Sequence, residues 1–514
     1  MTITELQQQY AAHPNTAVME RLLKDASVQT IFCGGLCASS ASLFSSVLVK
    51  QDVCPFVFVL GDLEEAGYFY HDLTQVLGTE KVFFFPSSFR RSIKYGQKDA
   101  ANEILRTEVL SRLQKGEEGL CIVTYPDALA EKVVSRKELS DKTLKLNVGE
   151  KLDTTFITDV LHSYGFEYVD YVYEPGQYAV RGSIIDVFSF ASEYPYRIDF
   201  FGDEVESIRT FEVESQLSRE RKEGVAIVPD LAVTGDVTTS FLDFIPKETV
   251  LAMRDFLWLR ERIQVVHDEA LTPQAIAVQE AEENGGITLE GKLIDGSEFT
   301  VRALDFRRME FGNKPTGTPD AKISFHTSVQ PIFHKNFDLV AGSFKDYLEQ
   351  GYSLYICSDS TKQTDRIRAI FEDRGDKIQF TPVVRTIHEG FVDHTLHLCI
   401  FTDHQLFDRF HKYNLKSDKA RSGKVALSLK ELNQFTPGDY VVHTDHGIGR
   451  FSGLVRIPNG DTTQEVLKLV FQNEDVVFVS IHSLHKVSKY KGKDGEAPRL
   501  NKLGTGAWEK LKDR

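Results

Sequence analysis

The first 130 residues alternate short apolar runs with stretches of helical periodicity. The apolar runs predict strands at 29–33, 55–60, 82–85 and 120–124. The stretches between them predict helices at 39–50, 63–77 and 97–114. Continuous apolar strands that are separated by helices are typical of a parallel sheet covered on both faces. Residues 1–130 are therefore expected to form an α/β domain.

After residue 131 the pattern changes, and apolar positions alternate with polar ones. One amphipathic helix is predicted at 154–164, with Phe156, Val160 and Leu161 on its apolar face. Strands are predicted at 168–173, 177–181, 184–188, 196–201 and 204–211. Pairs such as Pro175-Gly176 are typical of the turns between such strands. Residues 131–212 are therefore expected to be a small antiparallel α+β module inserted into the first domain.

Two further stretches continue the α/β part of the chain. Residues 213–320, with helices predicted at 239–245 and 255–281, are expected to be the second part of the first domain. Residues 323–407 predict strands at 352–358, 378–383 and 396–402 and a helix at 361–373. This last stretch is expected to be a second, small α/β domain, to which no activity is assigned.

The C-terminal part begins with a basic stretch, 408–430, which is expected to be a linker because charged runs are usually solvated. Residues 431–495 are dense in predicted strands and punctuated by glycines, which is typical of a small closed β-barrel. The last residues, 496–514, resemble the start of a helical connection. The predicted fold class is thus a multi-domain α/β protein with an inserted α+β module and a C-terminal β-barrel.

Length and charge restrict the function. The chain has 514 residues, more than the about 250–300 that one core supports, so several domains are expected. Its net charge of −15 makes non-specific binding to DNA or anionic membrane unfavourable, and favours protein partners. No apolar run has the length of a signal peptide or membrane span, and Cys33 and Cys37 lack a second pair or a nearby histidine at zinc spacing. A cytoplasmic protein with reduced thiols and no metal site is expected.

The first predicted strand leads into the position of a phosphate-binding loop, which contains Gly34, Gly35, Ser39 and Ser40. A working loop needs G-x-x-x-x-G-K-[ST], because backbone N–H groups cradle the phosphates and the lysine neutralises their charge. The second glycine, the lysine and the hydroxyl that follows it are missing, and the pattern occurs nowhere else in the chain. The sequence therefore predicts a degenerate nucleotide fold without ATPase activity, and weak binding through the backbone alone stays open.

Two predicted strands of the module have a polar side with a distinctive composition. Arg197, Asp199 and Phe201 share the polar side of one strand, and Arg181 lies on that of another. Arginines beside an aromatic side chain are enriched at binding hot spots. The residues also allow a second interpretation, in which Arg197 pairs with Asp199 or a neighbouring acid as an ordinary surface network and Phe201 packs under a loop. Both interpretations remain open at this stage.

The same residues carry a resemblance to a known family. The strings Arg181-Gly-Ser-Ile-Ile-Asp-Val-Phe188 and Arg197-Ile-Asp-Phe-Phe-Gly-Asp-Glu204 resemble the UvrA-binding module that UvrB shares with bacterial transcription-repair coupling factors, the Mfd family. The resemblance implies that Arg181, Arg197 and Phe201 contact UvrA. It also implies that residues 1–130 and 213–320 form a UvrB-like domain around the module. The missing loop lysine differs from UvrB, which hydrolyses ATP, and agrees with the degenerate copy in the Mfd family.

The C-terminal string around Gly447 and Gly449 resembles the RNA-polymerase-interacting domain of the Mfd family and of CarD-type regulators. The resemblance implies a Tudor- or SH3-like barrel that adds an edge strand to the polymerase β subunit. The corresponding contact residues are Val455, Arg456 and Ile457. His443, Asp445 and His446 lie nearby and are interpreted as structural turn residues, because the cluster lacks a further ligand.

Together these resemblances imply an adaptor for transcription-coupled nucleotide excision repair that binds UvrA and RNA polymerase. In the family a translocase motor follows the barrel, and ATP, Mg²⁺ and double-stranded DNA are expected to bind only there. No catalytic residue, cofactor or metal is therefore expected in this chain. The alternatives are a UvrB-type ATP-dependent damage-recognition subunit and a CarD-like regulator; a sugar- or nucleotide-binding α/β protein is a more distant one.

Overall fold

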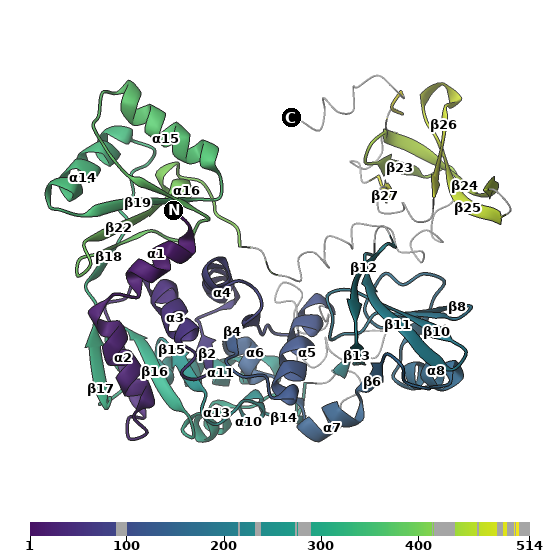
Figure 1. The fold of residues 1–514 in the computed structure, drawn as a ribbon, viewed down its shortest axis with the longest axis horizontal. Helices are drawn as coiled ribbons and strands as arrows, with labels where there is room; N and C mark the ends of the chain where they lie inside the picture. Colours follow the sequence, from purple (N-terminus) through teal and green to yellow (C-terminus); the bar gives the residue numbers. More distant parts are fainter. Residues whose placement is uncertain are drawn as a thin grey trace. The chain divides into compact units, whose positions relative to one another are not determined.

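The chain folds into two compact units, drawn in Figure 1. Unit 1 comprises Met1–Asp141 and Leu231–Leu415, and unit 2 comprises Lys142–Asp230 and Lys416–Arg514. The structure is a computed structural model, and it describes residues 1–88, 100–213, 216–231, 238–272, 275, 289–413, 415, 437–459, 462–480, 487–490, 498 and 500–502. In this part of the chain no helix is long and apolar enough to cross a membrane.

Unit 1 contains a seven-stranded sheet in which every neighbouring pair is parallel. In spatial order its strands are β17 (Ala321–Ser324), β1 (Thr30–Gly34), β16 (Arg307–Gly312), β15 (Val250–Met253), β2 (Phe56–Val59), β4 (Cys121–Thr124) and β3 (Val82–Phe84). The central strands β15, β2 and β4 are buried along their whole length, as a sheet covered on both faces requires. The predicted parallel sheet is thereby confirmed, although its UvrB-like relationship stays a prediction.

Polar caps fix where the long helices of unit 1 begin. Asp62 accepts a hydrogen bond from the Glu65 amide at 2.9 Å and starts α4 (Leu63–Leu77). Asp255 likewise starts α11 (Phe256–Ala270), since a carboxylate satisfies amides that have no partner within the helix. The remaining helices and short strands around this sheet are α1 (Ile3–Tyr10), α2 (Pro14–Lys24), α3 (Ser40–Gln51), α5 (Ala100–Lys115), α6 (Pro126–Ala130), α7 (Arg136–Asp141), α10 (Phe241–Phe244), α13 (Gly296–Ala303), β5 (Val133–Val134) and β14 (Thr238–Thr239).

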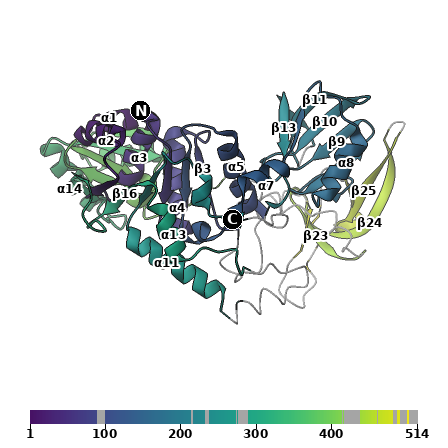
Figure 2. The same ribbon diagram turned by 90° about the horizontal axis from the view of Figure 1, so that it is seen from below.

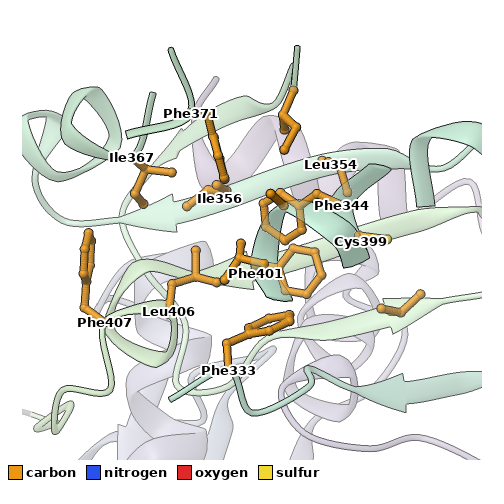
Figure 3. Close-up of a cluster of buried hydrophobic side chains, with 14 residues drawn as sticks. Phe333, Phe344, Leu354, Ile356, Ile367, Phe371, Cys399, Phe401, Leu406 and Phe407 are labelled. Atoms are coloured by element: carbon orange, nitrogen blue, oxygen red, sulfur yellow. The ribbon is translucent and has the colours of Figure 1, made fainter. Parts of the chain in front are cut away.

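A second, five-stranded sheet completes unit 1. Its order is β18 (Thr327–Val329), β21 (Phe391–Asp393), β22 (Leu398–Thr402), β19 (Ser353–Ser358) and β20 (Thr381–Val384). The accompanying helices are α14 (Phe337–Glu349), α15 (Thr361–Asp373) and α16 (Asp403–Leu406). Figure 3 shows side chains such as Phe344 and Phe401 filling the core of this part. The strand predicted at 378–383 is shifted, because Ile378 packs into the core before the strand starts.

Unit 2 contains a six-stranded module sheet of order β12 (Ser218–Lys222), β11 (Glu204–Phe211), β10 (Tyr196–Phe201), β9 (Ile184–Val187), β8 (Gln177–Arg181) and β7 (Glu167–Tyr168). β6 (Leu144–Asn147) pairs with β13 (Gly224–Ile227), and α8 (Thr154–Ser163) packs on the core. β12 and β13 lie inside the range 213–320 that the sequence analysis gave to the first domain. They pair with module strands because Val225 and Ile227 complete the module core.

Two predictions for the module were wrong in detail. The strand expected at 168–173 ends after Tyr168, since Val172 turns into a small separate apolar cluster. In α8 the buried positions are Ile157 and Leu161, one turn apart, whereas Phe156 is 52% exposed. Of the predicted apolar face, Leu161 is buried and Val160 half-buried, and only Phe156 is misplaced: Ile157 is buried in its stead, because both are apolar and the sequence alone does not rank them.

The C-terminal part of unit 2 is an antiparallel sheet of five described strands. Its order is β26 (Val476–Ser480), β25 (Thr462–Val470), β24 (Gly447–Asn459), β23 (Tyr440–His443) and β27 (Val487–Lys489), with the 3-10 turn η3 (Gln472–Glu474). Figure 2 shows β24 and β25 as a long hairpin. Closure into a Tudor- or SH3-like barrel stays a prediction. The predicted linker beyond residue 415 and most of the helical connection predicted at 496–514 lie outside the described residues; residues 498 and 500–502 are described and are not helical.

Candidate interaction sites

Strand register places the polar side chains of the module on one face of its sheet. Ile185, Ile198 and Ile208 lie opposite one another on neighbouring strands and are buried in the core. Side chains therefore leave the opposite face at the alternate positions. We name this opposite face the arginine face; it carries Arg181, Asp186, Arg197, Asp199, Phe201 and Arg209.

A buried carboxylate connects the two arginines that the sequence singled out. Asp186 has no solvent exposure. Its two oxygens accept hydrogen bonds from Arg197 Nε at 2.8 Å and from Arg197 Nη2 at 2.9 Å. Arg181 Nη2 donates to the same carboxylate. Since a buried carboxylate without partners would be unstable, the three residues depend on one another.

Arg197 has little capacity left for a partner protein. Its Nη1 donates to the Gln216 carbonyl at 3.1 Å, and its guanidinium carbon lies 4.4 Å from the centre of the Phe211 ring. The hydrogen bonds to Asp186 raise the pKa of Arg197 above its ordinary value. Its side chain is 14% exposed, against 35% for Arg181. Arg197 therefore organises the arginine face from within, and Arg181 is the more accessible of the two.

Among the described residues of the module, Phe201 is the most exposed large hydrophobic side chain. It follows a register shift between Asp199 and Phe200 and precedes the turn at Gly202, and it is 80% exposed. The interpretation in which it packs under a loop is wrong. The interpretation in which Arg197 pairs with a neighbouring acid is correct, with Asp186 as that acid.

The sequence analysis did not single out Asp186 or Arg209. Arg209 Nη2 forms an ion pair with Asp199, whose Oδ2 also accepts from Ser207 Oγ at 2.8 Å. A signal for Asp186 was present, because an acid inside a run of buried strand residues requires a basic partner. Which arginines supply the charge follows only from the strand pairing.

The hairpin of β24 and β25 offers a free strand edge. β23 pairs with β24 only through Gly447–Arg450, and no described strand pairs with the same edge of residues 452–459. Val455 is half-buried in this stretch, while the side chains of Arg456 and Ile457 lie outside the described residues. At the base of the hairpin the Asp445 amide donates to His443 Nδ1 at 3.1 Å, which is a turn contact.

The degenerate phosphate loop after β1 is filled by the chain itself. Gly35 has φ +84°, and a Cβ there would lie 2.0 Å from the Phe325 carbonyl oxygen. The Thr327 hydroxyl donates to the Gly35 carbonyl at 2.6 Å and accepts from the Cys37 amide at 3.1 Å. Gly35 is thus explained by the close approach of residues 325–327. The Cys37 amide, which would face a phosphate, already donates a hydrogen bond to Thr327.

Acidic groups border the same loop. The Ser39 hydroxyl accepts from the Glu389 amide at 2.9 Å, and the Ser42 hydroxyl donates to Asp72 at 2.7 Å. Burial raises the pKa of Asp72 to about 6, against hydrogen bonds that lower it. At neutral pH the Asp72 carboxylate would repel a phosphate. The residues around Gly34, Gly35, Ser39 and Ser40 therefore do not fit a nucleotide.

Residues 407–413, which we name the strap, connect the smaller sheet of unit 1 to α4. Phe407 lies at the border of the cluster in Figure 3, and Arg409 forms an ion pair with Asp403 at 2.6 Å. Tyr68 Oη donates to the His411 carbonyl at 2.7 Å. The ring of Tyr413 lies so close to α4 that a Cβ on Gly67 would be 2.5 Å from it.

Four histidines gather where the strap meets α4. The ring centroids of His404 and His411 are 4.4 Å apart and stacked, and those of His71 and His411 are 5.1 Å apart. Burial lowers the pKa of His71 and of His388 to about 4 and that of His404 to about 3. Among the described residues no group of histidine, cysteine and carboxylate side chains could hold a metal ion. The cluster is therefore a neutral packing contact.

The module carries the network around Asp186 with the exposed Phe201 beside it, and the C-terminal sheet carries the β24–β25 hairpin, one edge of which no described strand covers. These two features indicate a protein built of linked interaction domains. Residues 144–232 match the family model described as UvrB interaction domain, and residues 435–491 match the CarD-like/TRCF RID domain. The chain is 24% identical, over 93% of its length, to the transcription-repair-coupling factors of Staphylococcus aureus strains bovine RF122 / ET3-1 and USA300.

The corresponding protein of Staphylococcus haemolyticus strain JCSC1435 is also 24% identical, over 94% of the chain. The chain spans less than half the length of these relatives, 46% in the first two and 47% in the third. These matches confirm the resemblance to the N-terminal part of transcription-repair-coupling factors and the presence of both interaction domains.

Proposed function

We propose that this chain is an adaptor in transcription-coupled nucleotide excision repair. It recruits UvrA through the arginine face of the module, and it binds the β subunit of RNA polymerase through the C-terminal sheet. The two family models at 144–232 and 435–491 support the pairing of these partners in one chain. A UvrB-type or CarD-type protein would account for only one of the two domains.

The observation that carries the UvrA proposal is the exposure of Phe201. Four-fifths of this large apolar side chain is in water, 80% by area, although it stands on a polar face. An exposed aromatic side chain beside an arginine is typical of an interface anchor. Arg181, 35% exposed, lies on the same face and supplies a charge. UvrA would cover Phe201 and pair with Arg181, while Arg197 keeps the network in place.

The polymerase proposal rests on the edge of β24 at residues 452–459, beside which no described strand lies. An unpaired edge has N–H and C=O groups available for an additional strand from a partner. Pro458 lies in this stretch and has no N–H to donate, which is tolerated at an edge. Val455, Arg456 and Ile457 stay the proposed contact residues.

We propose no ATP turnover by this chain and no cofactor. The filled loop after β1 and the carboxylates beside it support this, because a nucleotide would have to displace internal hydrogen bonds. Translocation on double-stranded DNA, with ATP and Mg²⁺, would belong to a motor outside this sequence.

A crossed binding experiment tests both parts. Wild type, Phe201→Ala and Ile457→Ala are each titrated onto immobilised UvrA and onto immobilised RNA polymerase. Phe201→Ala should weaken UvrA binding about 30-fold, the loss of a hot-spot contact of about 2 kcal/mol, and leave polymerase binding intact. Ile457→Ala should do the reverse.

Phe156→Ala is the matched control for the UvrA site. Phe156 is 52% exposed in the same module, on the helix that covers the opposite side of the sheet. Its replacement should change UvrA binding less than about twofold. Equal losses from Phe201→Ala and Phe156→Ala would refute the assigned face, and a wild-type chain that captures neither partner would refute the adaptor function.

A further inference from the structure

The arginine face continues past β10 to the edge of the sheet. Strand register places Arg197 on β10, Arg209 on β11 and Arg221 on β12 directly opposite one another. Directly opposed residues of antiparallel strands leave the sheet on the same face, with Cβ atoms about 4.5–5.5 Å apart. The three arginines therefore form a row that runs from the middle of the sheet to its edge strand.

Neutralisation by acids decreases along this row. Arg197 is held by two hydrogen bonds to Asp186 and is 14% exposed. Arg209 has an ion pair with Asp199 and is 32% exposed. Arg221 is exposed, and within the described part of the chain no ion pair joins it to another residue. Like charges that face each other across strands destabilise a sheet, so folding stability does not explain the row.

The opposite face of β12 has a different charge pattern. Lys222 stands opposite Ile208, whose side chain is in the module core, so Lys222 leaves the sheet on the core side. It forms an ion pair with Glu220 at 2.8 Å. A strand charged only to prevent edge-to-edge aggregation would need no such asymmetry between its faces. The unneutralised charge is concentrated on the arginine face.

Exposed apolar side chains accompany the row. Phe201 is 80% exposed, and Leu217, directly before β12, is 69% exposed. Leu217 follows Gln216, whose carbonyl accepts the hydrogen bond from Arg197 at 3.1 Å, so it lies beside the start of the row. Basic groups between apolar side chains fit a protein surface that is acidic and partly apolar.

We infer that Arg209 and Arg221, in the row that Arg197 holds in place at its inner end, are a docking surface for an acidic segment of UvrA, which extends the interface to the edge strand β12. This inference rests on the proposed function of the module. A protein is favoured over nucleic acid because the chain carries a net charge of −15 and because Asp186 and Asp199 are fixed within the same face. Those carboxylates would oppose a phosphate backbone.

Adjacent residues of β12 provide the test. Arg221→Glu and Lys222→Glu make the same change of charge on the same exposed strand, but on opposite faces. Each variant of the full chain is titrated with UvrA at low and at high salt. Arg221→Glu should weaken binding about tenfold at low salt and less at high salt, whereas Lys222→Glu should change it less than about twofold. Hydrogen exchange of β11 and β12 checks folding, and Arg221→Gln should give an intermediate loss.

The outcomes separate this inference from the function on which it rests. Equal losses from both reversals would overturn it in favour of a general charge effect. No loss from Arg221→Glu, while Phe201→Ala still weakens UvrA, would overturn the row and leave the proposed function standing. No binding of UvrA by the wild type would overturn both. Capture of duplex DNA that Arg221→Glu abolishes, with UvrA binding unchanged, would assign the row to nucleic acid and overturn the inference.

Discussion

At the scale of single residues, the two arginines of the recognition strings have different roles. Arg197 makes three hydrogen bonds through its guanidinium and lies 4.4 Å from the centre of the Phe211 ring, whereas Arg181 makes one hydrogen bond, to Asp186, lies 5.2 Å from the centre of the Tyr171 ring and is more exposed. Replacing either arginine should weaken partner binding, because both changes disturb the arginine face, so a binding assay does not distinguish their roles. Stability distinguishes the two roles.

Arg197→Lys should destabilise the module by about 2 kcal/mol, because an ammonium group replaces neither the bidentate contact with Asp186 nor the stacking on Phe211. Arg181→Lys should cost less than about 1 kcal/mol, since that side chain is partly in water. Hydrogen exchange of the β9 and β10 amides measures both, and the first variant should exchange about 30-fold faster than wild type. Equal exchange in the two variants would contradict the division of roles.

The glycine at position 35 is required by a long-range contact and not by a phosphate. Its position after β1 is where a phosphate loop would be, and the sequence predicted a degenerate version of one. The reason for the glycine is the Phe325 carbonyl, which leaves no room for a Cβ. Phe325 is far away in the sequence, so no local pattern could have indicated this contact.

At the scale of elements, the strap is held against α4 by the close packing of Tyr413 on Gly67. Gly67 lies in the interior of α4, where glycine is about 1 kcal/mol less favourable than alanine. Its presence is explained by the Tyr413 ring, which occupies the space that a Cβ would need. The strap therefore anchors the start of the chain segment that leads toward the C-terminal sheet.

Gly67→Ala should favour the helix and yet release the strap. Trypsin cleavage after Arg409 and Lys412, followed by mass spectrometry, should be about tenfold faster than in wild type, because the Tyr413 ring is displaced. Gly342→Ala is the control, since Gly342 lies inside α14 with nothing within 4 Å of its Cβ position. Unchanged cleavage in Gly67→Ala would mean that the strap is not held by this contact.

At the scale of the whole molecule, the histidine cluster makes the stability of unit 1 depend on pH. Histidines in an unfolded chain take up protons as pH falls through about 6.5. In the folded protein burial keeps His71 and His388 neutral down to about 4 and His404 down to about 3, and burial also lowers the pKa of His411. The unfolded state then binds more protons, so stability falls as pH falls.

Carboxylates near the cluster act in both directions. Asp72, with a pKa raised to about 6, takes up its proton earlier when folded than when unfolded, which stabilises the fold on acidification. Burial also raises the pKa of Asp403, although Arg409 opposes this. The charge of Asp359 partly opposes the lowering of the pKa of His71 and His411 by burial. Four histidines outnumber the two aspartates of opposite sign, so the net effect between about pH 6.5 and pH 4 is destabilising.

Thermal unfolding of the chain, followed by the fluorescence of Trp258 in unit 1, should therefore show a midpoint that decreases from about pH 7 to about pH 5. His404→Gln should make this decrease shallower. The glutamine amide can still donate to the His388 carbonyl, which His404 Nε2 reaches at 2.7 Å, but it does not titrate. A midpoint that rises on acidification would show that the aspartates dominate.

The sequence by itself predicted most of the elements, the parallel sheet and the resemblance to a known family. The buried run of β2 is apolar at every position, that of β4 at every position but Thr124, and α15 occupies the predicted 361–373, because burial of a regular element leaves a pattern in neighbouring residues. The two strings of the module likewise lie in consecutive residues, so the resemblance to transcription-repair-coupling factors was available without a structure.

Only the tertiary structure decided how the side chains are paired. Asp186 on β9 pairs with Arg197 on β10. The register of β12 places Arg221 on the arginine face. The Phe325 carbonyl packs against Gly35. Each of these contacts joins residues that are separate in the sequence. Hydrophobic burial is a property of each position and can be predicted locally, whereas the partner of a charge depends on strand register and long-range packing.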